Sequence, residues 1–141
     1  MKRTEDSKLD ELGKLVLRAT IGGIMLFHGV GKMSHGVEGV KKLIATKGLP
    51  DFFAYGVYIG EVIAPLLMIV GFWSRTAALI VAFNMVVAIL TAHAGDVFKT
   101  GPGGGWAIEL QMLYLLGSLA VALLGPGRLS VSGMREGKRS R

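Results

Sequence analysis

An acidic residue, Glu61, stands in the middle of a long apolar stretch, and this placement is the strongest indication of chemistry in the sequence. A charged side chain at the centre of a membrane-spanning helix costs about 2.5–3.5 kcal/mol on insertion scales. Pro65 follows four residues later and has no N–H, so the carbonyl of Glu61 loses its usual helical partner. Glu61 is therefore a candidate for proton exchange or, alternatively, a structural tie between helices.

Polar residues of the neighbouring apolar stretches can be matched in depth with Glu61. Counting outward from a turn near residues 73–74 brings Asn84 close to the level of Glu61, so these two side chains could hydrogen-bond. Arg18 and His28 bracket Glu61 in depth, and an Arg18–Glu61 pair would form if both face the interior. Arg18 could instead extend to the cytoplasmic headgroups. The predicted pocket consists of these four residues.

Lys32, His93 and Glu109 occur at similar height nearer the predicted outer rim and form a second candidate polar cluster. His28 and His93 could together ligate a haem from two helices, but histidines near a membrane rim are more often hydrogen-bonded structural residues. The sequence has no cysteine, which excludes thiolate chemistry and cysteine-held metal sites. We expect no metal site, and a redox role would need an organic cofactor, a haem or a partner subunit.

Four long apolar runs separated by charged joints must position these residues. The chain has 141 residues, of which 51% are hydrophobic, and a mean hydropathy of +0.51. A bilayer core about 30 Å thick needs about 20 mostly apolar residues of helix. The runs that meet or approach this length are residues 15–31, 52–73, 76–94 and 106–124. We predict an all-α polytopic membrane protein whose four transmembrane helices form an up-and-down bundle.

The segments outside the four runs are short. Residues 1–13 mix acidic and basic side chains and are predicted to be a polar cytoplasmic segment, either a short solvated helix or disordered. Residues 14–127 would form the membrane domain, and residues 128–141 a basic, flexible cytoplasmic tail. In the first outer loop, Val37, Val40, Leu43 and Ile44 fall on one helical face, which predicts a short amphipathic helix on the membrane surface.

The lysines and arginines predict the orientation in the cell membrane. With four spans both termini lie on the same side of the membrane. That side would carry eleven of the basic residues, and the opposite side would carry five. Cytoplasmic segments are enriched in such residues, so both termini are expected in the cytoplasm. The net charge is +6, but the basic residues flank the apolar runs and have no aromatic residues interleaved with them. We therefore expect no nucleic-acid partner. The expected partner is the lipid bilayer, with a redox subunit or a second copy possible.

The ordered set of motifs resembles the DoxX-like family of small four-helix membrane proteins. It opens with Arg18-x3-Gly22-x4-Phe27-x-Gly29-x2-Lys32. It continues through Gly48-Leu49-Pro50, Glu61, Gly71, Arg75-Thr76-Ala77-Ala78, Met85, Ala88, Glu109 and Gly125-Pro126-Gly127-Arg128-Leu129-Ser130. The similarity covers roughly residues 15–130, and it departs at Val131-Ser132, where the family often has an apolar residue and Asp.

The resemblance implies association with membrane oxidoreductase systems, including thiosulfate:quinone and terminal quinol-oxidase assemblies, and with protection against oxidative or thiol stress. On this basis, the polar interior around Arg18, Glu61 and Asn84 could hydrogen-bond the carbonyls of a quinone head. Fold does not fix function, and three hypotheses stay open. The protein is a quinone-binding component that works with a redox partner, a non-catalytic scaffold that holds a partner enzyme through its basic tail, or a small-molecule transporter. Whether it is an enzyme stays open, because no redox centre is evident in the chain.

Overall fold

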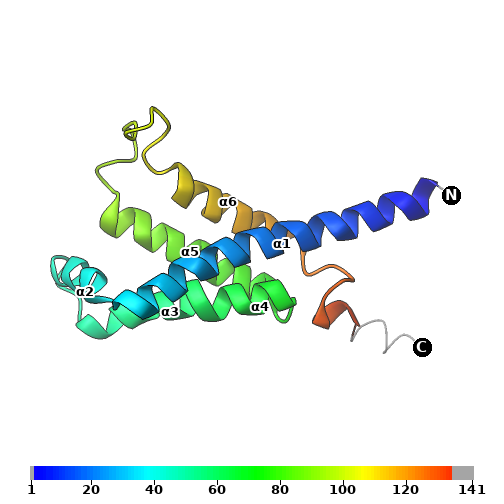
Figure 1. Cartoon of the computed structure of the whole chain (residues 1–141), viewed down its shortest axis with the longest axis horizontal. Coiled ribbons are helices and arrows are strands. Elements are labelled where there is room, and N and C mark those ends of the chain that lie inside the picture. Colours follow the sequence, from blue (N-terminus) through cyan, green and yellow to red (C-terminus); the bar gives the residue numbers. More distant parts are fainter. Residues whose placement is uncertain (1, 135–141) are drawn as a thin grey trace.

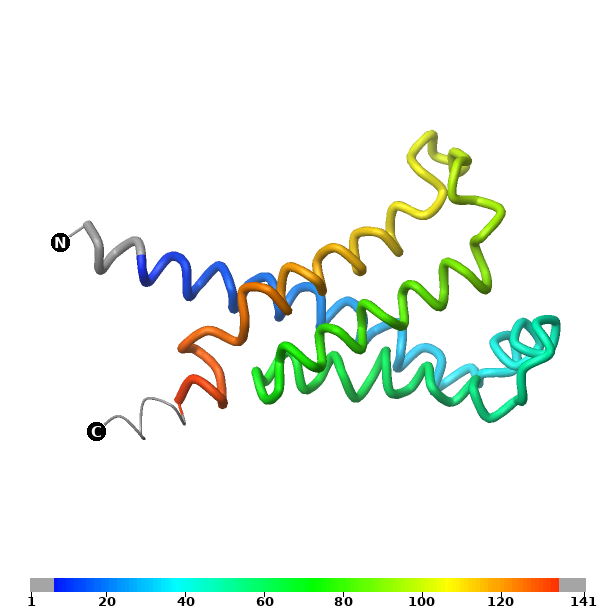
Figure 2. The backbone as a smooth tube through the Cα atoms, turned by 180° about the vertical axis from the view of Figure 1, so that it is seen from behind, coloured from blue at the N-terminus to red at the C-terminus, as the bar shows by residue number. Residues whose placement is uncertain are grey.

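The computed structural model describes residues 2–134, with side chains from Ser7 onward. Over this range the chain is helical apart from turns, loops and one isolated bridge between Thr100 and Trp106. The helices are α1 (Lys2–His35), α2 (Glu38–Ala45), η1 (Asp51–Tyr55), α3 (Gly56–Tyr58), η2 (Ile59–Ile63), α4 (Ala64–Val70), α5 (Ser74–Ala92) and α6 (Glu109–Leu124). Figures 1 and 2 show α1, the continuous segment from η1 to α4, α5 and α6 extending along the long axis of the molecule.

Two of these segments, Asp51–Val70 and Ser74–Ala92, are long and apolar enough to cross a membrane. They correspond to the predicted runs 52–73 and 76–94. The apolar helix α6 has 16 residues and starts later than predicted, since Trp106 belongs to the preceding loop, where its Nε1 donates to the carbonyl of Val97 at 2.6 Å. The all-helical class is confirmed, while four crossings stay a prediction.

The helix α2 forms where the sequence predicted an amphipathic helix. Val37 and Ile44 are buried against Ala54 of η1, with Tyr58 packed beside them. Figure 1 shows α2 at the end of the molecule away from the amino terminus. This helix therefore covers one end of the bundle, and its placement on the membrane surface stays a prediction.

Glycines of α1 allow this helix to approach the segment η2–α4 closely. A Cβ at Gly22 would lie 2.7 Å from Cγ1 of Ile69, and a Cβ at Gly29 would collide with the carbonyl of Glu61. Small residues are typical of such contacts between membrane helices. The contact of Gly29 thus lies in the π-helical turn η2, where Pro65 leaves the carbonyl of Glu61 without its α-helical partner, and the contact of Gly22 lies in α4.

Residues 125–134 fold back across the end of the bundle that carries the first half of α1 (Figure 1). Ser132 donates its N–H to the carbonyl of Gly71 at 3.3 Å, and the guanidinium of Arg18 donates to the carbonyl of Leu129. The described part of the predicted flexible tail, residues 128–134, is therefore docked against the helices. The remainder of that tail, residues 135–141, lies outside the described residues.

Glu11 holds this docked segment to α1 and makes the contact dependent on pH. Its carboxylate accepts hydrogen bonds from Nζ of Lys14 at 2.8 Å and from the backbone N–H of Arg128. Lys14, followed by the Arg128 amide, holds the pKa of Glu11 below the usual 4.5. A lowered carboxyl pKa means that the contact is fully present above the usual pKa and is lost as the pH falls through the lowered value.

We therefore expect the ¹⁵N–¹H resonance of Arg128 to be constant near neutral pH and to shift as the pH is lowered below the usual carboxyl range. The same titration of Glu11→Gln should show no such step, because the amide side chain does not ionise. A step of equal size in both proteins would show that another group controls the contact.

Candidate functional site

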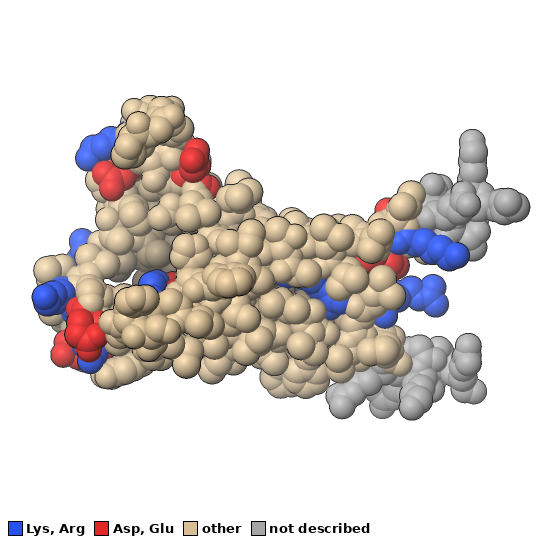
Figure 3. Space-filling view, in the orientation of Figure 1, with Lys and Arg blue, Asp and Glu red and all other residues tan. Residues whose placement is uncertain are grey.

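A cavity of about 670 Å³ lies among the helices near α2. This volume is within the range of about 300–1,000 Å³ that is typical of small-molecule sites. The polar residues that line it are His28, Lys32, Glu61, Asn84, Thr91, His93, Gln111 and Tyr114, and the rest of the lining is mainly apolar. Figure 3 shows a hollow in the surface near this end, with basic and acidic atoms recessed inside it.

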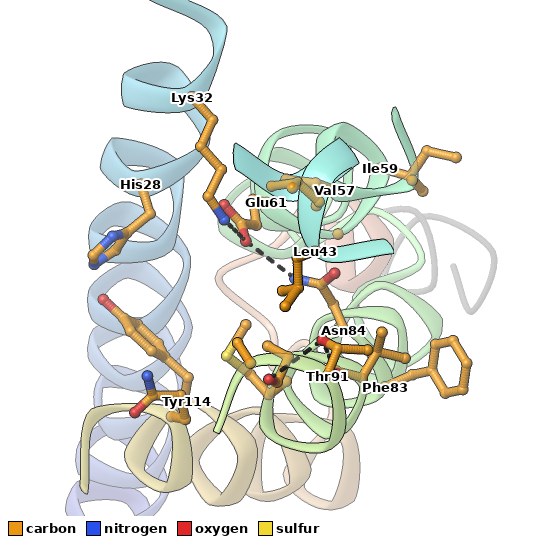
Figure 4. A pocket seen from close by; sticks show the side chains of 18 of the residues that line it. His28, Lys32, Leu43, Val57, Ile59, Glu61, Phe83, Asn84, Thr91 and Tyr114 are labelled. Atoms are coloured by element: carbon orange, nitrogen blue, oxygen red, sulfur yellow. Dashed lines mark hydrogen bonds and ion pairs between the residues drawn. The ribbon is translucent and has the colours of Figure 1, made fainter. Parts of the chain in front are cut away.

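The carboxylate of Glu61 is the centre of a buried polar cluster. Nζ of Lys32 donates to Oε1 of Glu61 at 2.6 Å, and Nδ2 of Asn84 donates to the same oxygen at a long 3.4 Å (Figure 4). The side chain of Glu61 is 5% exposed and that of Lys32 is 37% exposed. The other carboxylate oxygen, Oε2, is buried and has no hydrogen-bond partner among the groups that the structure describes.

The predicted hydrogen bond between Glu61 and Asn84 is confirmed, and its geometry depends on Gly60. A Cβ at Gly60 would lie 2.5 Å from Cγ of Asn84, so only a glycine lets the amide side chain lie across η2. The ion pair with Lys32 was not predicted, since Lys32 was assigned to the outer rim. The ion pair could have been predicted from the position of Lys32 three residues after Gly29, on the face of α1 that packs against η2.

Tyr114 and His28 form a further part of the cavity wall, on the side of α1 and α6 (Figure 4). Their rings meet edge to face, with centroids 5.8 Å apart and an interplanar angle of 88°. Tyr114 is 4% exposed, and its buried hydroxyl has no hydrogen-bond partner in the described part of the chain. Sequence reasoning missed Tyr114, although a phenol inside an apolar run is a visible exception.

Both ring nitrogens of His93 lie near side chains of the protein. Its Nε2 lies 3.0 Å from Nε2 of Gln111, and its Nδ1 lies 3.7 Å from Oδ2 of Asp96. The ammonium of Lys99, 3.1 Å from Asp96, is the main cause of a lowered pKa of Asp96, and His93 contributes to the same shift. Among the side chains that the structure describes, from Ser7 to Met134, there is no group of three or more His, Cys, Asp or Glu that could hold a metal ion.

Two of the predicted site residues lie away from the cavity. Arg18 is 1% exposed, and its partner is the carbonyl of Leu129 at the other end of the bundle, so the predicted pair with Glu61 does not form. The alternative of contact with headgroups is also wrong, because the side chain is buried. Glu109 is exposed at the start of α6 and does not line the cavity. The structure brings together His28, Lys32, Glu61, Asn84 and His93.

Comparison with known proteins shows the family of the chain. The DoxX family profile matches residues 13–94. The chain is 34% identical over 119 residues to the Bacillus subtilis (strain 168) protein named "Putative oxidoreductase CatD", with 84% of both chains covered. It is 30% identical over 126 residues to the Escherichia coli (strain K12) protein named "Inner membrane protein YqjF", covering 88% of this chain and 92% of the relative. No solved structure matches the chain significantly. This all-helical chain is a membrane protein of the DoxX family.

Proposed function

We propose that the protein binds a quinone or quinol at the cluster of Lys32, Glu61 and Asn84, as the membrane component of a quinone-linked oxidoreductase system. The observation that carries the proposal is the buried carboxylate of Glu61. One of its oxygens is paired with Lys32, and the other has no partner among the described residues although it lines a mainly apolar cavity. The names of the relatives, an oxidoreductase and an inner membrane protein, support a redox role at the bilayer.

The chemistry of the cavity fits a quinone head. The ammonium of Lys32 can donate to a carbonyl oxygen, and Oε2 of Glu61 can accept a hydrogen bond from the hydroxyl of the reduced form. Apolar residues line the space around these groups, and a ring would pack against them. Ile59 and Phe83 line the cavity and are 50% and 69% exposed, so the lining continues to the outer surface of the bundle, where an apolar tail would leave.

The residues of the cluster would hold a proton and orient the ligand. Oxidation of a quinol to a quinone releases two protons and two electrons. Oε2 of Glu61 is the acceptor for the proton of the hydroxyl that it binds, and Lys32 holds that oxygen in place by electrostatic attraction. The proton of the other hydroxyl would leave to water, which reaches the cluster where the side chain of Lys32 is 37% exposed. The two electrons would pass to the redox centre of a partner protein. The proposal keeps the predicted orientation, with both termini in the cytoplasm.

Glu61→Gln tests the proposal with the whole protein in lipid nanodiscs. A neutral amide cannot accept a proton and makes a weaker hydrogen bond, so we expect the Kd for a short-tailed hydroquinone to rise about 10-fold, since a hydrogen bond to a charged group contributes about 1.5–3 kcal/mol. The matched control is Glu109→Gln, which removes an exposed carboxylate outside the cavity and should leave the Kd unchanged.

Equal affinity of Glu61→Gln and the unaltered protein would contradict the proposal. Absence of hydroquinone binding to the unaltered protein would also overturn it. Thermal unfolding of each variant in the same nanodiscs separates a loss of binding from a loss of fold.

A further inference from the structure

Arg18 is a buried charge that the proposed function does not use. Its side chain is 1% exposed and is the largest fully buried side chain in the described part of the chain. Nη2 of its guanidinium donates to the carbonyl of Leu129, while Nε and Nη1 have no hydrogen-bond partner among the described groups. A buried donor without a partner is unfavourable, and more so when it carries charge.

This guanidinium also has no counter-ion. No carboxylate of the described residues forms an ion pair with Arg18. Glu11, whose negative charge acts on Arg18, is already bound by Nζ of Lys14 at 2.8 Å and by the backbone N–H of Arg128. Since an unpaired buried charge is costly, Arg18 is suited to bind an anion from outside the chain.

The turn between α4 and α5 lies against the guanidinium. Gly71 has a φ of +76°, and a Cβ at this position would collide with Nη1 of Arg18. Three residues later α5 begins at Ser74, which is 2% exposed and whose hydroxyl has no partner among the described groups. The amino terminus of this 19-residue helix has no side-chain cap. The helix dipole there favours negative charge, as the guanidinium does.

The segment that covers Arg18, residues 125–134, is held mainly by polar contacts (Figure 1). They are its hydrogen bonds with Glu11, Arg18 and Gly71, and none of its residues belongs to the apolar core cluster of the helices. Both two-donor edges of a guanidinium include Nη2, the nitrogen that donates to Leu129. An anion that binds Arg18 through two N–H groups therefore has to displace the carbonyl of Leu129.

We propose that Arg18 is the centre of a phosphate-binding site, at the end of the bundle opposite the cavity, which the carbonyl of Leu129 closes in this structure. Two oxygens of a phosphate group match the two-donor edge of a guanidinium. Inorganic phosphate and the phosphate of a lipid headgroup share this chemistry, and both require residues 125–134 to move off Arg18. The site does not depend on the proposed function.

The whole protein in phosphate-free dodecyl maltoside micelles tests the site. The readout is the ¹⁵N–¹H resonance of Ser132, whose N–H donates to the carbonyl of Gly71 at 3.3 Å. Inorganic phosphate replaces chloride at constant ionic strength in one series, and phosphatidylglycerol is added in a second. We expect at least one ligand to shift this resonance saturably. Arg18→Gln should raise its Kd about 10-fold or more, because a hydrogen bond to a charged group is lost.

Arg18→Lys keeps the charge but has no two-donor edge, so it should also bind more weakly, and it decides the question if Arg18→Gln does not fold. The unfolding temperature of each variant without ligand shows whether it is folded. Arg128→Gln is the matched control, since it removes an exposed guanidinium beside Leu129 and keeps the backbone N–H that binds Glu11. This control should leave the Kd unchanged.

A shift caused by inorganic phosphate would support the site with a soluble anion as its ligand, and a shift caused by phosphatidylglycerol alone would support it with a lipid headgroup. The proposal is wrong if neither ligand shifts the resonance of Ser132. It is also wrong if Arg128→Gln weakens binding as much as Arg18→Gln, because the anion would then bind the exposed basic residues instead.

Discussion

Lys32→Met is expected to destabilise the protein by about 3 kcal/mol, because it leaves the carboxylate of Glu61 charged and buried without its cation. Glu61→Gln should be much less damaging, since the ammonium of Lys32 that it leaves behind is 37% exposed and stays solvated. This asymmetry follows from the unequal burial of the two partners. Reversible unfolding of each single variant in the same detergent measures it.

The double variant Lys32→Met with Glu61→Gln should recover most of the lost stability, because neither charge then remains in the cavity. Lys99→Met provides a comparison, since Lys99 and Asp96 form an ion pair of 3.1 Å with both side chains at least 40% exposed. That change should alter the free energy of unfolding by less than about 1 kcal/mol. Equal effects of Lys32→Met and Lys99→Met would show that the buried pair has no special stabilising role.

Gly29→Ala is expected to destabilise the protein by about 1–3 kcal/mol, which is typical of overpacking at a close contact. The new Cβ would meet the backbone carbonyl of Glu61 and lie 2.7 Å from Cγ2 of Val62, and backbone atoms cannot rotate away as a side chain can. The separation of α1 from η2 would then increase, and the distance from Lys32 to Glu61 with it. The free energy of unfolding in detergent and the affinity for a hydroquinone should both decrease.

Gly23→Ala is the matched control for this prediction, since a Cβ at Gly23 would have no atom within 4 Å. Alanine has the higher helix propensity, so this variant should be as stable as the unaltered protein or more stable by up to about 1 kcal/mol. A similar loss in both variants would indicate a general cost of alanine in α1 rather than a contact with Glu61.

The sequence predicted that Asn84 lies at nearly the same depth in the bundle as Glu61, because the two residues belong to adjacent segments joined by a short turn. Counting from that turn fixes their heights, and the hydrogen bond between them is observed. The amphipathic pattern of Val37 and Ile44 likewise predicted the helix α2. Both successes depend on contacts that are local in sequence or fixed by a tight connection.

The partners of Lys32 and Arg18 could not be found by matching the depths of their Cα atoms. Side chains on a helix tilt toward its amino terminus, and both residues belong to α1. The tilt brings the ammonium of Lys32 back into the bundle toward Glu61 and takes the guanidinium of Arg18 away from Glu61 toward Leu129. The start of α6 was predicted too early. The hydrogen bond that holds Trp106 in the loop goes to a loop carbonyl, and the pattern of apolar residues in the sequence does not show such a bond.

The contact between Arg18 and Leu129 joins positions 111 residues apart in the chain. During synthesis Arg18 is made long before Leu129, so the guanidinium has no access to this acceptor while the apolar helices between them are being made. The burial of Arg18 at this end of the bundle therefore follows the synthesis of α6, and it depends on the segment after α6 rather than on the helices alone.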